Sequence, residues 1–168
     1  GNYKYRMMNI DYKEGKFSEA MVKHSEILSK YSESDVKSDA DYVAGQIAFA
    51  QGKYQEAIAL LSPILPGNAN YVYARYTVGI SWSRLQDMDK AELAFKDIID
   101  YMPANKSEAD MQAAAKVKLG HLYFSATPTP RVAEAATLYK SVTRESPVYD
   151  EAMLGIAWSF LKVQKPGQ

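Results

Sequence analysis

One phrase occurs twice in this chain of 168 residues, and the repetition limits the folds that the sequence can adopt. Residues 15–28 read GKFSEAMVKHSEIL and residues 52–65 read GKYQEAIALLSPIL, which is the same pattern 37 positions later. Gly, Lys, Glu, Ala, Ser, Ile and Leu recur in place, and the aromatic Phe17 is replaced by Tyr54. Self-similarity at a fixed period of this size is typical of repeat proteins, in which each repeat builds one supersecondary unit. We therefore expect an array of similar units along the chain.

Further copies of the phrase follow at comparable spacing. Its alanine returns at Ala20, Ala57, Ala91 and Ala135, with intervals of 37, 34 and 44 residues. An apolar stretch with a central glycine precedes each of the last three phrases, at Gly45, Gly79 and Gly120. A fifth such stretch, around Gly155, has no second half. The pattern predicts four complete units and one half-unit.

Each unit reads as a pair of helices. Apolar residues in the glycine-containing stretches recur at helical spacing, and Ala91, Phe95, Ile98 and Ile99 lie on one face of a helix. Glycine and alanine at fixed places allow two antiparallel helices to cross closely. Neither helix buries its apolar face alone, so neighbouring units must stack. The predicted fold is all-α: a right-handed α-solenoid of four antiparallel helix pairs plus a terminal helix, about nine helices in total.

We expect the whole chain, residues 1–168, to form one repeat domain. The units are predicted at about 1–34, 38–70, 72–105 and 113–147, with a half-unit at 148–163, and residues 104–112 read as a long linker. The final segment either caps the array or continues into further repeats. Continuation is favoured, because Trp158, Phe160 and Leu161 are apolar for a capping helix. Since the chain begins with Gly1 rather than Met, we interpret Gly1 as a cloning remnant and the chain as part of a longer protein.

Composition excludes several classes of function. Twenty basic and twenty acidic residues cancel, so no positive field would attract nucleic acid. Zero cysteines exclude disulfides and thiolate metal sites. No apolar run approaches the roughly 18–20 residues that span a bilayer. We therefore expect neither a nucleic-acid partner nor a membrane span.

Catalytic chemistry has no candidate in the sequence. We interpret His24 as a packing residue beside Ile27 and Leu28, and His121 has no second histidine or carboxylate pair to complete a zinc site. Asp39 and Asp41 are interpreted as acidic residues of a helix start, where carboxylates favour the helix dipole. We predict no catalytic residues, no metal and no cofactor, and hence no enzyme.

The pattern resembles the tetratricopeptide repeat (TPR). The unit from 72 to 105 matches that family through Gly79, Trp82, Ala91, Phe95 and Pro103, and the unit before it matches through Gly45, Gly52, Tyr54 and Ala57. The linkers and the stretch from Tyr101 to Asp110 are similar to repeats of bacterial cell-envelope proteins, such as outer-membrane assembly lipoproteins and coiled-coil partners of the Tol–Pal system. That similarity favours a periplasmic or outer-membrane-associated location over a cytoplasmic one.

The resemblance implies a concave groove lined by the first helix of each unit. Its lining here would be Tyr5, Asn9, Tyr12, Tyr42, Gln46, Phe49, Tyr73, Tyr76, Ile80, His121 and Phe124. Tyrosine offers a large, rigid contact area with a hydroxyl group that stays hydrated, which suits a recognition surface. The alternative is that these rings pack between adjacent first helices. A clamp for a C-terminal carboxylate is disfavoured, because the family's Lys and Asn pair is replaced by Tyr5 with Asn9.

Two functions follow from this interpretation. In the first, the chain is a scaffold or adaptor that binds a peptide or helix of a protein partner in the tyrosine-rich groove. In the second, it is a structural module of a larger envelope protein, and it self-associates or stacks through residues 148–163.

Overall fold

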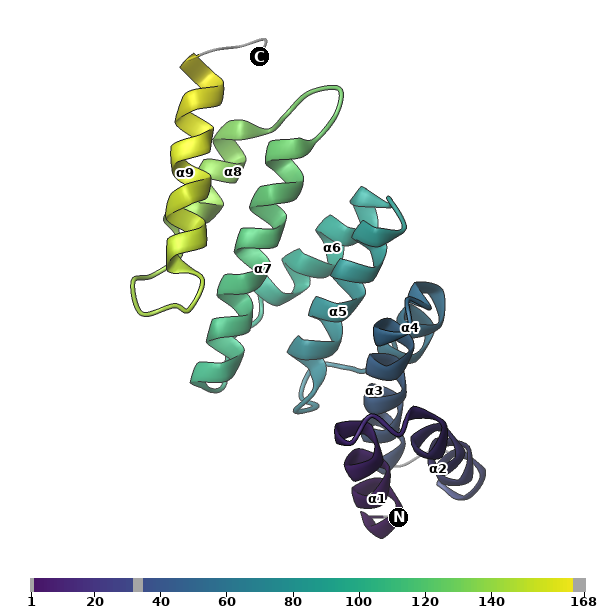
Figure 1. Cartoon of the computed structure of the whole chain (residues 1–168). Helices are drawn as coiled ribbons and strands as arrows, with labels where there is room; N and C mark the ends of the chain where they lie inside the picture. The colour runs from purple at the N-terminus through teal and green to yellow at the C-terminus, as the bar shows by residue number, and fades with distance from the viewer. Residues whose placement is uncertain (1, 32–34, 165–168) are drawn as a thin grey trace. The chain divides into compact units, whose positions relative to one another are not determined.

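The computed structural model describes residues 2–31 and 35–164, and this part of the chain is helical with no strand (Figure 1). Gly1, the predicted end of the first repeat at residue 34 and the last four residues of the predicted domain lie outside these ranges. The helices are α1 (Asn2–Lys13), α2 (Phe17–Lys30), α3 (Asp35–Ala50), α4 (Tyr54–Leu61), α5 (Tyr71–Arg84), α6 (Met88–Ile99), α7 (Lys106–Ser125), α8 (Val132–Lys140) and α9 (Tyr149–Gln164). They fall into two compact units, Gly1–Asp87 and Met88–Gln168.

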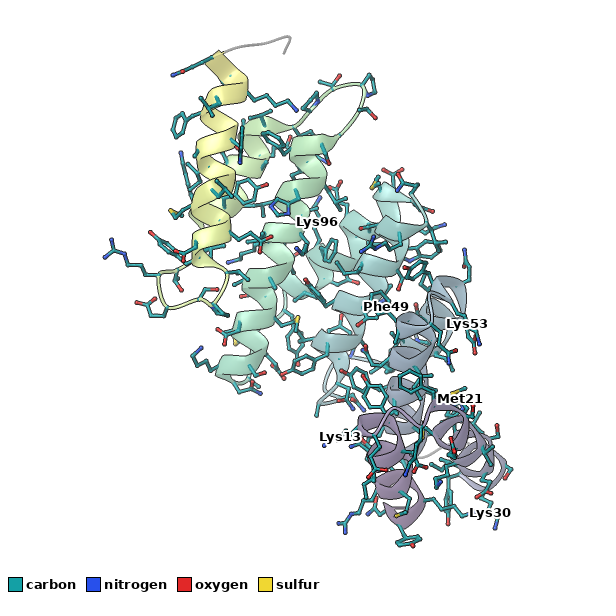
Figure 2. All side chains as sticks on the ribbon, in the orientation of Figure 1. Lys13, Met21, Lys30, Phe49, Lys53 and Lys96 are labelled. Carbon is teal, nitrogen blue, oxygen red and sulfur yellow. The ribbon has the colours of Figure 1, made fainter. Side chains whose placement is uncertain are left out.

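Helices of the first unit pack in the order of the chain. α1 contacts α2 and α3, α3 contacts α4, and α5 contacts both α3 and α4. The core between α1, α2 and α3 consists of Met8, Ala20, Ile27, Ala40, Val43, Ala44 and Ile47. Met21, labelled in Figure 2, packs against this core from α2. The all-helical class and the sequential packing that the repeat predicts are thus confirmed.

The repeated phrase builds the same turn twice. Gly15 follows α1 with φ +75° and Gly52 follows α3 with φ +74°, in the left-handed region that favours glycine. Each glycine donates its N–H to the carbonyl three residues back, to Tyr12 or Phe49, at 3.0 Å. The lysine after each glycine donates to the carbonyl five residues back, at 2.8 and 2.9 Å. This bond pair is the Schellman motif, which ends the helix by satisfying its last carbonyl groups.

A third copy of the turn ends α5 without glycine. Gln86 takes the left-handed place with φ +63°, and its N–H donates to the carbonyl of Ser83 at 3.1 Å. Asp87 N–H donates to the carbonyl of Trp82 at 3.0 Å. The third turn therefore has the same two backbone hydrogen bonds as the first two, but glutamine instead of glycine adopts the left-handed conformation.

In the second unit, Tyr139 of α8 lies between two glycines. α7 contacts α8 and α9, and α8 contacts α9. A Cβ atom built at Gly120 of α7 would lie 2.5 Å from the Tyr139 ring, and one built at Gly155 of α9 would lie 2.7 Å from it. Tyr139 is almost fully buried. Glycine is therefore required at both positions, because the Tyr139 ring fills the space that a side chain on α7 or α9 would need.

A clasp of charged and polar side chains joins α6, α7 and α8. Tyr123 Oη donates to Glu92 Oε1 at 2.7 Å, and Arg131 Nη1 donates to Glu92 Oε2 at 2.8 Å. The Arg131 guanidinium also lies 3.7 Å from the centroid of the Tyr123 ring. Burial would raise the pKa of Glu92, but hydrogen bonds from Lys96 and Tyr123 and the charge of Arg131 lower it. The carboxylate therefore stays ionised at the centre of the clasp.

The prediction of a linker at 104–112 is wrong, because most of this segment is helical. α7 begins at Lys106 and is 20 residues long. The Asn105 side chain caps it by accepting the N–H of Glu108 at 2.9 Å, and Glu108 accepts the N–H of Ala104 at 2.7 Å. Gln112 Nε2 donates to the carbonyls of Ile98, Ile99 and Tyr101, within 3.1 Å of each. The segment thus starts its own helix and satisfies the end of α6.

Two side chains from the sequence analysis meet in the core of the first unit. His24 of α2 is buried, as its packing interpretation predicts. The interpretation of Asp39 and Asp41 as acidic residues of a helix start is wrong, because α3 begins at Asp35 and both lie beyond its first turn. Asp41 is buried and contacts His24. Lys37 of α3 also donates to the Asp41 carboxylate. A polar contact therefore joins α2 and α3 within an otherwise apolar core.

Candidate functional site

All eleven residues of the predicted groove are partly exposed, and none is fully buried. Nine of them lie in the first unit, on α1, α3 and α5. His121 and Phe124 lie on α7 in the second unit, so the two groups are described separately.

Four tyrosines of the first unit lie near one another on three helices. Burial raises the pKa of Tyr42 to about 12, and the neighbouring Tyr12, Tyr73 and Tyr5 add to this increase. Tyr5 and Tyr12 come from α1, Tyr42 from α3 and Tyr73 from α5. We call these four residues the tyrosine face. The sequence predicted each member, and the structure brings them together.

The rings of the tyrosine face also contribute to packing. Tyr5, Tyr12 and Tyr42 contact the buried core of the first unit while each keeps an exposed part. Tyr12 stacks on Phe17 with ring centroids 6.2 Å apart. Phe49, labelled in Figure 2, contacts the edge of Tyr54 at 5.7 Å between centroids. The packing alternative therefore describes one side of these rings and leaves their outer side available for contact.

Polar residues near the tyrosine face link α3 to α5. Gln46 of α3 bonds to Tyr42 and donates its Nε2 to Thr77 Oγ1 of α5 at 3.0 Å. Asn70 Nδ2 donates to Asp39 Oδ1 at 2.9 Å, which joins the start of α5 to α3. Burial raises the pKa of Asp39, and burial together with the Asp39 charge raises the pKa of Tyr5. The face thus has neutral phenols, a fixed amide and one carboxylate at its edge.

Three further predicted residues lie on two of the helices that carry the tyrosine face. Asn9 is on α1, and Tyr76 and Ile80 are on α5, all partly exposed. They are on the helices that carry the tyrosine face, and the prediction that they line a groove stays a prediction.

The second unit has a pocket between α7, α8 and α9. Its volume is about 500 Å³, and its lining is His121, Phe124, Ser125, Tyr139, Glu151, Leu154, Gly155 and Trp158. His121 and Phe124 are the two predicted residues of this unit. The other lining residues were missed, because the resemblance pointed only to first-helix places in complete repeats. Gly155 could have indicated them from the sequence, since it marks α9 as the first helix of another unit.

Charge in this pocket is concentrated at Glu151. Its Oε1 lies 3.3 Å from Lys118 Nζ and 3.7 Å from His121 Nδ1. Burial lowers the pKa of His121, Glu151 partly opposes this decrease, and Lys118 adds to it. His121 is therefore mainly neutral near pH 7, and the pocket combines an apolar wall with a neutral imidazole and a paired carboxylate.

Within residues 2–31 and 35–164, no three His, Asp or Glu side chains are grouped so that they could hold a metal ion. No helix in those ranges has the length and apolar character needed to cross a bilayer.

A scan of the chain against protein-family models found no match, and a search of curated protein sequences found none either.

Proposed function

We propose that this chain is a protein-interaction scaffold of the tetratricopeptide type, and that its tyrosine face binds a peptide or helix of a partner protein. The observation that carries the proposal is the convergence of Tyr5, Tyr12, Tyr42 and Tyr73 from three helices, all partly exposed, with the first three packed against the core. Such rings lose little conformational entropy on binding because they are already fixed.

The chemistry of the face favours a partner segment with apolar anchors and few acidic groups. The phenols offer ring surfaces and hydrogen bonds, while Asp39 at the edge disfavours a second carboxylate. A segment with leucine or aromatic anchors and a basic residue near Asp39 fits this arrangement. The proposal includes no catalysis, metal or cofactor.

The solenoid and the cellular location belong to the same proposal. Three copies of the Schellman turn and the sequential packing of α1 to α5 support a right-handed α-solenoid in which hairpins stack. The similarity to envelope repeats supports a periplasmic or outer-membrane-associated location.

Affinity capture from a lysate of the source organism tests the binding proposal. We expect the parent chain to recover a partner that a Tyr42→Ala, Tyr73→Ala variant does not recover. The matched control is a Tyr3→Ala, Tyr31→Ala variant, which removes two tyrosines that are exposed and outside the predicted groove. Circular dichroism must show that both variants are folded. Equal recovery by all three chains would overturn the proposal.

A further inference from the structure

Helix α9 has one apolar face on its hairpin and another that the described chain does not cover. Ala152, Gly155 and Ser159 lie on the buried face, three and four residues apart. Leu154, Ala157, Trp158 and Leu161 follow the same helical spacing two residues further on, and all four are exposed. We call these four residues the outer stripe. In Figure 1, α9 is the yellow helix beside α8.

Two of the four stripe places, those of Leu154 and Trp158, are buried in α3 and α7. The repeat places a glycine in each of these first helices: Gly45 in α3, Gly120 in α7 and Gly155 in α9. The residue before it is Ala44, Leu119 or Leu154, with exposures of 0 %, 1 % and 57 %. The residue three places after that glycine is Ala48, Tyr123 or Trp158, with exposures of 2 %, 6 % and 54 %. At these two places α9 exposes large apolar side chains, whereas α3 and α7 bury theirs.

The side chains along the stripe are spaced so that a second, antiparallel copy can lie opposite them. Leucine stands at each end, at Leu154 and Leu161, and Ala157 and Trp158 stand at the centre. A two-fold axis placed between Ala157 and Trp158 brings each leucine opposite the other leucine of a second copy. It also brings the small Ala157 opposite the large Trp158. Self-complementarity of this kind is what a two-fold symmetric interface requires.

The charges of α9 select the antiparallel orientation. Asp150 lies in its first turn, and Lys162, which donates to the carbonyl of Phe124, lies in its last turn. An antiparallel pair places the acidic end of one helix beside the basic end of the other, and it opposes the two helix dipoles. A parallel pair would place like charges together at both ends.

From these observations we propose that two copies of this chain pair through the outer stripe, with the two α9 helices antiparallel. The occupant of the exposed face is the same face of a second copy. The pairing is independent of the tyrosine face, because it uses only α9 of the second unit.

Mass measurement over a range of concentrations tests the pairing. We expect the weight-average mass of the parent chain to rise twofold, from that of one chain to that of two. Leu161→Glu should weaken association by about tenfold or more, since it places two carboxylates in the apolar interface. Leu93→Glu is the matched control, because Leu93 is an exposed leucine on α6 of the same unit and outside the outer stripe. A monomer at every concentration, or equal association of both variants, would overturn the proposal.

Cysteine cross-linking tests the orientation, and the absence of native cysteine leaves no background. Differently tagged Leu154→Cys and Leu161→Cys chains are mixed and oxidised. The antiparallel pair predicts a disulfide between the two different variants, since these positions face each other across the axis. Cross-linking of each variant only with itself would indicate parallel helices and contradict the proposal.

Discussion

His24 Nε2 lies 2.7 Å from Asp41 Oδ1, and both side chains are buried between α2 and α3. The ring nitrogen donates, because an ionised carboxylate only accepts. Burial would raise the pKa of Asp41, but hydrogen bonds from His24 and Lys37 and their charges lower it. The contact therefore keeps a charged group inside the first unit and holds two successive helices together.

Replacing His24 should destabilise the first unit. His24→Ala leaves the buried Asp41 carboxylate without one donor and opens a cavity, which should lower the free energy of unfolding by about 2–3 kcal/mol. Urea denaturation measures this loss. His121→Ala is the matched control, because His121 is much more exposed, and we expect a smaller effect. Equal losses in both variants would show that the His24–Asp41 contact contributes no specific stability.

Acidification should change the stability contributed by two aspartates of α3 in opposite directions. The pKa of Asp41 is lower in the folded chain than its ordinary value of 3.8, so the unfolded chain binds the extra proton. The stability that this group contributes above pH 3.8 is lost as the pH falls through its folded pKa. Asp41→Asn should be less stable than the parent at neutral pH, and it should lose less stability on acidification.

Asp39 supplies the control of opposite sign. Burial raises the pKa of Asp39 above 3.8, so the folded chain binds the proton more tightly. Acidification relieves the cost of its buried charge, and Asp39→Asn should therefore lose more stability than the parent on going to low pH. Denaturation curves for the three chains at about pH 7 and about pH 3 give both slopes. The same slope for both variants would contradict the assignment.

Sequence periodicity predicted the helices because each apolar side chain repeats at the same interval. It predicted His24 as buried from its place beside Ile27, yet it could not pair His24 with Asp41, 17 residues away on another helix. Spacing along one helix gives a residue's face but not the residue opposite it. The tyrosine face had the same limit: the resemblance predicted its members, and only the structure shows which of them meet.

Local capping chemistry explains the main error in the fold. Residues 104–112 are polar and read as a linker, but Asn105 and Glu108 close the first turn of a helix. Such a helix needs no apolar stripe in its first turns, so hydrophobic periodicity does not detect it.

The two glycines around Tyr139 should not tolerate alanine. Alanine favours a helix by up to about 1 kcal/mol over glycine, but a Cβ atom at Gly120 or Gly155 would overlap the Tyr139 ring. Overpacking typically costs about 1–3 kcal/mol, so Gly120→Ala and Gly155→Ala should each destabilise the second unit. In a Tyr139→Leu background the clash is reduced and the sign should reverse or vanish. Thermal melts of the single and double variants measure this coupling, and additive effects would contradict it.

Glycine at position 86 should stabilise the first unit. Gln86 adopts φ +63° in the turn that Gly15 and Gly52 occupy in the other two copies, and a side chain there costs free energy. Gln86→Gly removes that cost and keeps the Schellman hydrogen bonds to Ser83 and Trp82, so we expect a gain of about 0.5–1 kcal/mol in the free energy of unfolding. Gly52→Gln is the reciprocal change and should destabilise by a similar amount, because it introduces the same strain at the equivalent place. Chemical denaturation of both variants tests the pair. If Gln86→Gly is neutral or destabilising while Gly52→Gln is destabilising, the three turns are not equivalent, and the weak hydrogen bond from Gln86 Nε2 to the carbonyl of Ser83, at 3.3 Å, stabilises more than the backbone strain costs.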